Sequence, residues 1–336
     1  MHLFLYEWIT GGGLVEQPGP LPESMLAEGA AMVAALAADF SALGDCQVTV
    51  LRDMRLLDLS MPNCEIVDIH STSDHVGTID RLAAATDLTL VIAPEFDNLL
   101  LNIVKQVLRE GGHLLSAGES LVALTADKRR TAKQLASRGV SVPESILIAA
   151  DQEKLPADFP YPAVLKPVHG AGSQHTLLVA SASDEPPPHP WPRILQRYHQ
   201  GVPASVSVLC GPAGIYSLPP CRQHLTTDGR FTYMGGSLMQ EPDLAARASA
   251  LARQAIAALP MPHGYLGVDL VLGPSNDGSE DVVIEINPRL TTSYIGLRQA
   301  STGNLAQAML DVAMGRVPEL AFRPDPLRFT VTPMVS

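Results

Sequence analysis

The stretch GYLGVDLVLGPSNDGSEDVVIEINPRLTTSYIGLR, residues 264–298, decides how this chain of 336 residues is expected to fold. It contains two apolar runs, residues 265–272 and 281–286, separated by the sequence Gly-Pro-Ser-Asn-Asp-Gly. Because that separator consists of turn-forming residues, the stretch predicts two antiparallel strands joined in a hairpin.

Three oxygen-bearing side chains interrupt the apolar character of this hairpin. Asp269 lies in the first run, and Glu285 and Asn287 lie two residues apart in the second strand, so they point to one face. A carboxylate within an apolar segment is costly unless it is paired or binds a metal. Oxygen ligands suit Mg²⁺, so we expect a site for Mg²⁺, or alternatively Mn²⁺, with Arg289 beside it. The competing interpretation is a surface hairpin with solvated acids.

Composition and charge narrow the class of protein. Hydrophobic residues make up 46% and charged residues 17% of the chain, as in globular proteins of two or three domains. The formal charge of −12 disfavours binding to nucleic acid or anionic membranes. The four cysteines lack CxxC spacing, and we expect neither a signal peptide nor a membrane-spanning segment. We therefore expect a cytoplasmic protein with small-molecule partners, and a homodimer stays open.

Residues 1–117 alternate between strand-like and helix-like patterns. This alternation predicts a mostly parallel, three-layer α/β domain. Strands are expected at residues 2–8, 46–51, 65–69, 88–93 and 113–116, and helices at residues 23–43, 76–85 and 98–110.

Two features of this domain are candidates for contacts with a substrate. Gly11, Gly12 and Gly13 follow the first strand without forming a GxGxxG motif, so we expect a tight turn or a loop whose backbone approaches a substrate. Glu95 follows the strand at 88–93, at the edge where open α/β sheets bind ligands. An acid at a helix N-terminus is the alternative for Glu95.

A phosphate-binding arrangement is expected around residue 166. Lys166 lies at the end of the apolar segment 161–167, and a glycine-rich loop that contains Gly170, Gly172 and Ser173 follows it. Backbone N–H groups of such a loop can cover phosphates while the ammonium group neutralises them. Because the lysine precedes the glycines, this loop is not a Walker A loop.

Taken in this order, the motifs resemble the ATP-grasp superfamily. The pattern of Asp269 followed by Glu285-Ile-Asn287-Pro-Arg289 is similar to the metal-binding strand pair of that superfamily, and the resemblance covers about residues 118–310. It implies a Rossmann-like pre-ATP-grasp α/β domain followed by a two-lobed α+β ATP-grasp fold. The domain and the two lobes are expected at residues 1–117, 118–192 and 193–336.

The resemblance also implies roles for residues upstream of the hairpin. Lys128, on a helix predicted at residues 120–138, would reach the nucleotide phosphates, and a solvated basic face is the alternative. Gln196 and Tyr198 would hold the edge of the adenine. Members of the superfamily often carry a ribose-binding glutamate a few residues later, and this chain has no acid there, so Ser205 is the substitute.

The chemistry implied by the resemblance is ATP-dependent ligation of a carboxylate to an amine. The carboxylate attacks the γ-phosphate of ATP to form an acyl phosphate, and the amine then displaces phosphate. Lys166 and Arg289 would offset the negative charge that builds up, and Arg222 would bind the carboxylate or the acyl phosphate. A kinase or carboxylase with the same ATP site and a non-catalytic nucleotide-binding module are the competing classes.

A narrower resemblance concerns two short stretches. Residues 7–13, Glu-Trp-Ile-Thr-Gly-Gly-Gly, and residues 287–294, Asn-Pro-Arg-Leu-Thr-Thr-Ser-Tyr, are similar to the tyramine–glutamate ligases of methanofuran biosynthesis. This resemblance implies glutamate as the carboxylate substrate and an aromatic amine, tyramine or tyrosine, as the acceptor. It also implies that Ser293 and Tyr294 form part of the acceptor wall.

Overall fold

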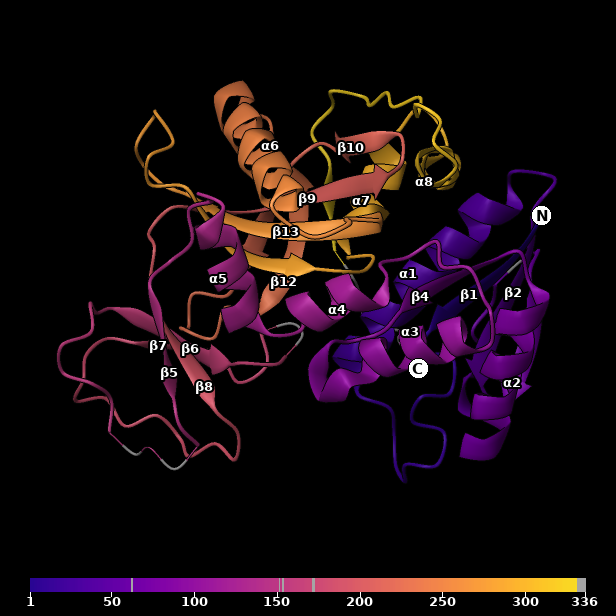
Figure 1. Cartoon of the computed structure of the whole chain (residues 1–336), viewed down its shortest axis with the longest axis horizontal. Coiled ribbons are helices and arrows are strands. Elements are labelled where there is room, and N and C mark those ends of the chain that lie inside the picture. Colours follow the sequence, from indigo (N-terminus) through magenta and orange to yellow (C-terminus); the bar gives the residue numbers. More distant parts are fainter. Residues whose placement is uncertain (62, 151, 153, 171–172, 331–336) are drawn as a thin grey trace.

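The computed structural model describes residues 1–61, 63–150, 152, 154–170 and 173–330. These residues form three parts: an N-terminal α/β domain, a small lobe and a large lobe (Figure 1). In the view of Figure 1 the N-terminal domain lies at the right, the small lobe at the lower left and the large lobe above them.

The N-terminal domain contains a four-stranded parallel sheet in the order β3-β2-β1-β4. Its strands are β1 (His2–Glu7), β2 (Gln47–Asp53), β3 (Glu65–Ile69) and β4 (Leu88–Ile92). Its helices are α1 (Glu23–Ser41), α2 (Thr72–Ala85) and α3 (Leu99–Arg109), with 3₁₀ turns η1 (Met54–Leu56) and η2 (Phe96–Asn98). The predicted parallel α/β domain is confirmed, but the strand expected at residues 113–116 is only a parallel bridge between Leu114 and Thr89.

Helix α1 has the length and the apolar composition of a membrane-spanning helix. It packs against β1 and β2 and against two helices of the large lobe, α7 (Ser293–Ala300) and α8 (Leu305–Ala313). Leu36 and Phe40 of α1 are fully buried in this packing. The apolar composition of α1 is therefore accounted for by a core that the domain shares with the large lobe.

The small lobe is built on a four-stranded antiparallel sheet in the order β5-β8-β6-β7. Its strands are β5 (Ser145–Ile148), β6 (Ala163–Pro167), β7 (Leu177–Val179) and β8 (Arg193–Arg197). We expected residue 193 to open the large lobe, but β8 pairs with β5 and β6, so the boundary expected at 192/193 cuts this sheet. We therefore propose a lobe boundary between β8 and β9 (Val202–Gly211).

The large lobe is built on a seven-stranded antiparallel sheet in the order β14-β13-β9-β11-β12-β15, with β10 paired to β9. Besides β9, its strands are β10 (Gly214–Ser217), β11 (Cys221–Leu225), β12 (Tyr233–Leu238), β13 (Gly264–Leu272), β14 (Val282–Asn287) and β15 (Arg328–Phe329). Helix α6 (Pro242–Ala257) packs on the sheet together with α7 and α8.

Two short helices replace the single helix predicted at residues 120–138. They are α4 (Glu119–Thr125) and α5 (Lys128–Ser137). The side chain of Asp127 caps α5 by accepting hydrogen bonds from the backbone N–H groups of Arg129 and Arg130, at 2.9 and 3.0 Å. Because the chain breaks at this cap, Lys128 begins α5 instead of lying in the middle of a helix.

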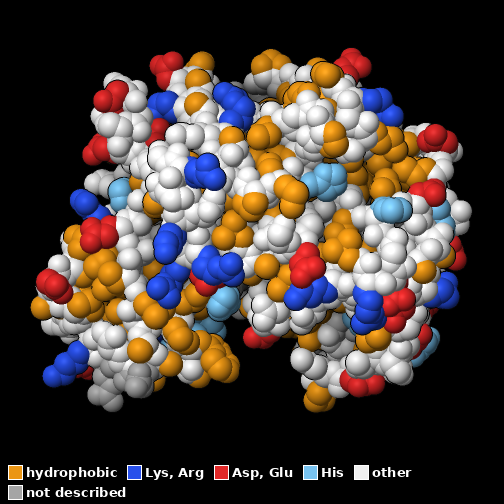
Figure 2. All heavy atoms as spheres, viewed as in Figure 1, with side chains coloured by type: hydrophobic (Ala, Val, Ile, Leu, Met, Phe, Trp, Pro, Cys, Tyr) orange, Lys and Arg blue, Asp and Glu red, His pale blue; other side chains and the backbone are white. Residues whose placement is uncertain are grey.

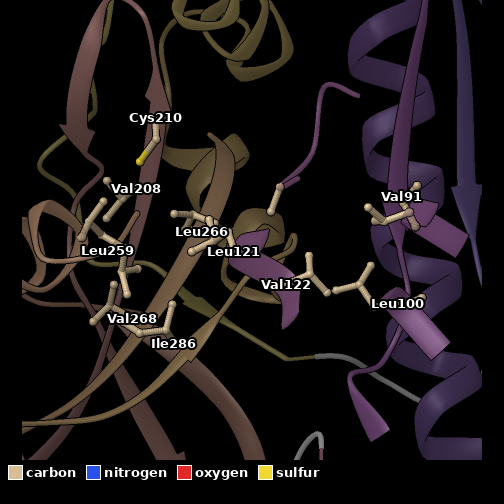
Figure 3. Close-up of a cluster of buried hydrophobic side chains, with 14 of the residues drawn as sticks. Val91, Leu100, Leu121, Val122, Val208, Cys210, Leu259, Leu266, Val268 and Ile286 are labelled. Carbon is tan, nitrogen blue, oxygen red and sulfur yellow. The ribbon is translucent and has the colours of Figure 1, made fainter. Parts of the chain in front are cut away.

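A hydrophobic core joins the N-terminal domain to the large lobe through α4 (Figure 3). In the close-up Val122 lies near Leu100 of α3, and Leu121 lies near Leu266 of β13. Each of these four side chains is at most 1% exposed. The small lobe has a separate core, so α4 fixes the other two parts against each other without involving it.

We predict that Leu121→Ala lowers the free energy of unfolding by about 2–5 kcal/mol, because it leaves a cavity in the core between domain and lobe. Leu108 of α3 is 42% exposed and provides the matched control. Leu108→Ala is expected to change stability by only about 0.5 kcal/mol. Urea denaturation followed by circular dichroism measures both, and equal losses would contradict the role of α4.

Candidate active site

A cavity of about 540 Å³ lies where the three parts meet. The N-terminal domain contributes residues from β1 and α1, the small lobe from β6 and β8, and the large lobe from β9, β11, β13 and β14. On the face drawn in Figure 2, a notch separates the small lobe from the N-terminal domain. Ligand sites commonly occupy such junctions between domains.

The predicted hairpin is confirmed, because β13 and β14 pair antiparallel with Asp269 opposite Glu285. Glu285 and Asn287 both line the cavity, whereas Ile286 between them is buried in the core. This alternation is the one expected of a strand. The pairing register shifts by one residue at Ile284, directly before Glu285, and such bulges often re-aim side chains beside active sites.

Both carboxylate oxygens of Asp269 accept hydrogen bonds from neutral amides. Asn287 donates Nδ2–H to Oδ2 at 3.0 Å, and Gln223 of β11 donates Nε2–H to Oδ1 at 2.9 Å. Burial raises the pKa of Asp269 to about 6, and the negative charge of Glu285 adds to this shift. The two carboxylates therefore repel each other, and a cation bound between them would relieve this repulsion.

The donor set fits a divalent cation that prefers oxygen ligands. Asp269 and Glu285 offer carboxylate oxygens from paired strand positions, and Asn287 offers an amide oxygen. Within the described ranges, no group of three or more His, Cys, Asp and Glu side chains is arranged to hold a metal. A third ligand here would thus be an amide, and a set of hard oxygen donors suits Mg²⁺.

Two lysines from different elements face the carboxylates of the hairpin. Lys128 Nζ lies 3.0 Å from Glu285 Oε1 and donates a hydrogen bond to the carbonyl oxygen of Gly170 at 2.7 Å. Lys166 on β6 is 5% exposed, and burial lowers its pKa to about 8 although Glu285 and Asp269 oppose this shift. Both ammonium groups line the cavity, where they can neutralise the charge of a phosphate.

The glycine-rich loop and the end of β8 also contribute to the cavity. Ser173 lines it, and its hydroxyl donates a hydrogen bond to the carbonyl oxygen of Phe231 at 2.5 Å. The ring of Tyr198 stacks on that of Phe231, with ring centroids 6.1 Å apart. Gln196 is 7% exposed and lines the same cavity, whereas Gly172 lies outside the described residues. The residues that were predicted to contact the nucleotide, as far as the structure describes them, thus line the same cavity.

Arg289 lines the cavity and is held there from the N-terminal domain. Glu95 accepts hydrogen bonds from Arg289 Nε at 2.9 Å and from Nη2 at 3.3 Å, and its side chain is 4% exposed. Glu95 itself does not line the cavity. We expected Glu95 to contact a substrate, but its buried carboxylate orients Arg289 instead.

The structure places Arg222, predicted to bind the substrate, outside the cavity. Arg222 Nη2 donates a hydrogen bond to Glu241 Oε1 at 2.7 Å, and the residue does not line the cavity. Its neighbour Gln223 lines the cavity and binds Asp269. Because successive residues of a strand point to opposite faces, the residue of β11 that faces the cavity lies one position after the predicted one. This alternation could have indicated Gln223 from the sequence, but only if the position of β11 in the sheet had been known.

The glycines predicted to approach a substrate serve packing instead. A Cβ atom at Gly12 would lie 2.7 Å from Ile69 Cγ2, and one at Gly13 would lie 2.3 Å from Trp8 Nε1. None of Gly11, Gly12 and Gly13 lines the cavity. The segment is the tight turn that was the alternative interpretation.

The predicted acceptor wall and ribose contact are only partly in place. Ser293 lines the cavity, but Tyr294 is fully buried and donates its hydroxyl hydrogen bond to Asp39 Oδ2 at 2.6 Å. The structure places Tyr294 in the core, where it joins α7 to α1, and not on the cavity wall. Ser205 lines the cavity, and its hydroxyl forms a hydrogen bond with the carboxylate of Asp269. That bond places Ser205 beside the hairpin acids.

Two acidic residues of the N-terminal domain escaped the sequence analysis as site residues. Glu7 ends β1 and Glu28 lies on α1, and both line the cavity close enough for the positive charge of Arg289 to act on them. A signal existed for Glu7, because it ends a parallel strand at the sheet edge where Glu95 follows β4. For Glu28 the alanine-rich helix gave no such signal.

Comparisons with known proteins decide the family. The profile of the ATP-grasp domain matches residues 125–293, about half of the chain, and that of the pre ATP-grasp 3 domain matches residues 46–122. The chain belongs to the ATP-grasp family. The predicted fold, an α/β pre-ATP-grasp domain followed by an α+β ATP-grasp fold, is thereby confirmed.

Curated relatives of this ATP-grasp protein span nearly its whole length. It is 26% identical over 312 residues to the tyramine–L-glutamate ligase of Methanocaldococcus fervens, which covers 92% of this chain and 94% of the relative. It is 25% identical over 332 residues to the enzyme of the same name from Methanocaldococcus jannaschii, which covers 98% and 94%. Together with the family match, these relatives indicate an ATP-dependent ligase that forms a C–N bond.

Solved structures share the fold. An ATP-grasp superfamily protein from Archaeoglobus fulgidus is 24% identical with a TM-score of 0.71, over 95% of this chain and 89% of that chain. An ADP complex of N5-carboxyaminoimidazole ribonucleotide synthetase is 17% identical with a TM-score of 0.72, over 97% and 79%. The L-amino acid ligase of Bacillus licheniformis is 15% identical with a TM-score of 0.65, over 93% and 73%.

We predict that Lys166→Met raises the free energy of unfolding by about 2–3 kcal/mol at pH 7, because the pKa of the buried ammonium lies near 8 instead of 10.5. A lysine whose folded pKa is lowered costs stability below that pKa, and the cost disappears as pH rises towards the unfolded pKa. The gain should therefore shrink between pH 8 and 10.5, the window set by the two pKa values.

Urea denaturation of both proteins across this pH range measures the effect. The same variant is expected to lose affinity for ATP, because it lacks a phosphate-neutralising charge. A gain in stability that is constant from pH 7 to 10 would show that Lys166 is not the titrating group.

Proposed function

We propose that this protein is a cytoplasmic ligase that joins glutamate to an aromatic amine, tyramine or tyrosine, through an acyl phosphate. The cavity at the junction carries the proposal, because it gathers two lysines, the acids of the hairpin and Arg289 in one space. The names of the two curated relatives support glutamate and tyramine as substrates. The sequence resemblance implies that this reaction belongs to the biosynthesis of a methanofuran-type cofactor.

ATP is proposed to bind between the two lobes. Lys128 and Lys166 neutralise its phosphates, and the loop that ends at Ser173 covers them. Gln196 and Tyr198 at the end of β8 hold the adenine edge. The hydrogen bond of Lys128 to the Gly170 carbonyl oxygen supports this arrangement, because it ties the loop to the first turn of α5.

Mg²⁺ is proposed to bind to Asp269, Glu285 and Asn287. When bound, it would neutralise charge on the phosphate oxygens. The two carboxylates support this position, because burial and their mutual repulsion disfavour their negative charges and a bound cation would offset both effects. Lys128, 3.0 Å from Glu285, supplies part of that positive charge.

The chain's own residues favour acyl phosphate formation by position and charge. A carboxylate oxygen of glutamate attacks the γ-phosphorus, and the bond between that phosphorus and ADP breaks. Arg289, oriented by Glu95, offers its guanidinium to the carboxylate and then to the acyl phosphate. The walls that the three parts provide limit the access of water, which would hydrolyse this intermediate.

Phosphate release tests the proposed substrates. We expect purified protein with ATP, MgCl₂ and glutamate to release phosphate when tyramine or tyrosine is added, because the amine consumes the acyl phosphate. Aspartate in place of glutamate is the matched control for the carboxylate. If no member of a panel of aromatic and aliphatic amines stimulates ADP formation with glutamate, the proposed substrates are wrong.

We predict that Glu285→Gln lowers kcat by more than about 100-fold. Loss of a residue that only hydrogen-bonds a metal ligand typically costs roughly 10- to 100-fold, and Glu285 is proposed to be a ligand itself. The reason is that the variant keeps the shape of the side chain but removes one anionic ligand and the partner of Lys128. Glu280→Gln, an exposed position in the turn of the same hairpin, is the control and should retain activity. Full turnover by Glu285→Gln would disprove the metal site.

A further inference from the structure

Glu7 is a buried carboxylate of the cavity that the phosphate chemistry does not use. It ends β1, is 5% exposed and lines the cavity. Its Oε2 accepts hydrogen bonds from the backbone N–H of Thr10 at 2.8 Å and from the Thr10 hydroxyl at 2.7 Å. These bonds fix its orientation without supplying a positive charge, and burial raises the pKa of Glu7 to about 7.

Helix α1 leaves room for this carboxylate at Gly29. A Cβ atom at residue 29 would lie 2.6 Å from Cδ and from Oε1 of Glu7. A glycine inside a helix is less favourable than alanine by roughly 0.5–1 kcal/mol, and the surrounding helix is rich in alanine. The close approach of Glu7 is the physical reason for a glycine at this position.

Glu28, next to Gly29 on α1, is a second carboxylate of the same cavity. Burial raises its pKa, and the positive charge of Arg289 opposes that shift. The charge of Arg289 acts on both carboxylates, but the carboxylate that accepts its hydrogen bonds is that of Glu95. In the part of the chain that the structure describes, neither Glu7 nor Glu28 forms an ion pair. Among the described residues, two carboxylates therefore line the cavity without a salt-bridge partner.

Apolar side chains line the cavity beside these two carboxylates. Trp8 and Phe96 meet edge to face, with ring centroids 6.1 Å apart. Met25 and Met32 of α1 line the same cavity. An aromatic amine carries an apolar ring and an ammonium group, so this combination of apolar wall and carboxylates matches both of its parts.

We propose that Glu7 and Glu28 bind the ammonium group of the amine substrate, and that Glu7 takes a proton from it. This inference rests on the proposed function, because it assigns the site of the second substrate of that reaction. The cavity then has lysines for the phosphates of ATP on one side and carboxylates for the ammonium group on the other. Arg289 lies close enough to act on Glu7 and Glu28 and also on Asp269 of the hairpin.

The proton transfer makes the amine a nucleophile. As R–NH₃⁺ it has no lone pair, and transfer of one proton to the Glu7 carboxylate gives R–NH₂. Its nitrogen forms the C–N bond at the acyl carbon, and the C–O bond to phosphate breaks with its electron pair on the phosphate. The second nitrogen proton passes to a phosphate oxygen, and Glu7 returns its proton to solvent.

Hydroxylamine separates activation of the amine from formation of the acyl phosphate. It is uncharged at neutral pH and attacks acyl phosphates without a protein base. The purified protein is therefore assayed with ATP, MgCl₂ and glutamate, with either tyramine or hydroxylamine as the nucleophile. The readout is kcat and KM for tyramine against the rate of hydroxamate formation.

The expected results differ among four variants. Glu7→Gln lowers kcat with tyramine about 100-fold or more relative to the hydroxamate rate, as is typical for loss of a general base. Glu28→Gln raises KM for tyramine about tenfold, because one ionic hydrogen bond is lost. Gly29→Ala lowers the tyramine rate selectively, because its methyl group displaces the Glu7 carboxylate. Glu23→Gln, exposed at the start of α1, is the control and changes neither reaction.

The outcomes distinguish failure of the proposed amine site from failure of the proposed function. If Glu7→Gln alters both reactions equally, or neither, while circular dichroism shows it folded, the assignment of the amine site is overturned. If Glu7→Gln fails to fold, Gly29→Ala and Glu28→Gln decide the inference by the same comparison. If the unaltered protein forms neither hydroxamate nor amine-dependent ADP with glutamate, the proposed function fails and this inference falls with it.

Discussion

Lys128 Nζ lies 3.0 Å from Glu285 Oε1 and 2.7 Å from the carbonyl oxygen of Gly170, and these two contacts tie three distant segments together. The first turn of α5, the second strand of the hairpin and the glycine-rich loop thereby meet at one ammonium group. The pair is largely buried, and a buried charge that loses its partner is strongly destabilising. Asp269 and Lys166 lie close enough to this pair for the charges to act on one another, so all four side chains take part in the same charge compensation.

A second ion pair orients the site from the opposite side. Glu95 of the N-terminal domain holds Arg289 of the large lobe, and both side chains are largely buried. This pair fixes the guanidinium relative to Asp269 and Glu285, while the α4 core holds the two parts of the protein together. The cavity thus receives charges of both signs from three parts of the chain, although the net charge is −12.

The sequence predicted the parts of the site whose chemistry is local. The hairpin with Asp269, Glu285 and Asn287 on one face followed from alternation within strands, and the structure confirms that geometry. Arg222, Tyr294 and the glycines at 11–13 were predicted to contact a substrate but lie outside the cavity, because their surroundings come from distant segments. Gln223 and Glu28 were missed for the same reason, because their place in the site depends on how distant elements pack. Glu7 ends a strand at the sheet edge where ligands bind, and this signal was overlooked.

The amino-acid sequence by itself determined most of the elements and the resemblance to the family. Strand alternation, turn residues and a strand lysine before glycines depend on neighbours within a few residues, so they are present before the chain folds. The tertiary structure alone decided which charges meet, because the contact of Glu95 with Arg289 spans 194 residues and that of Lys128 with Gly170 spans 42. It also decided that Gly29 faces Glu7, since the space around a side chain is set by every element that packs against it.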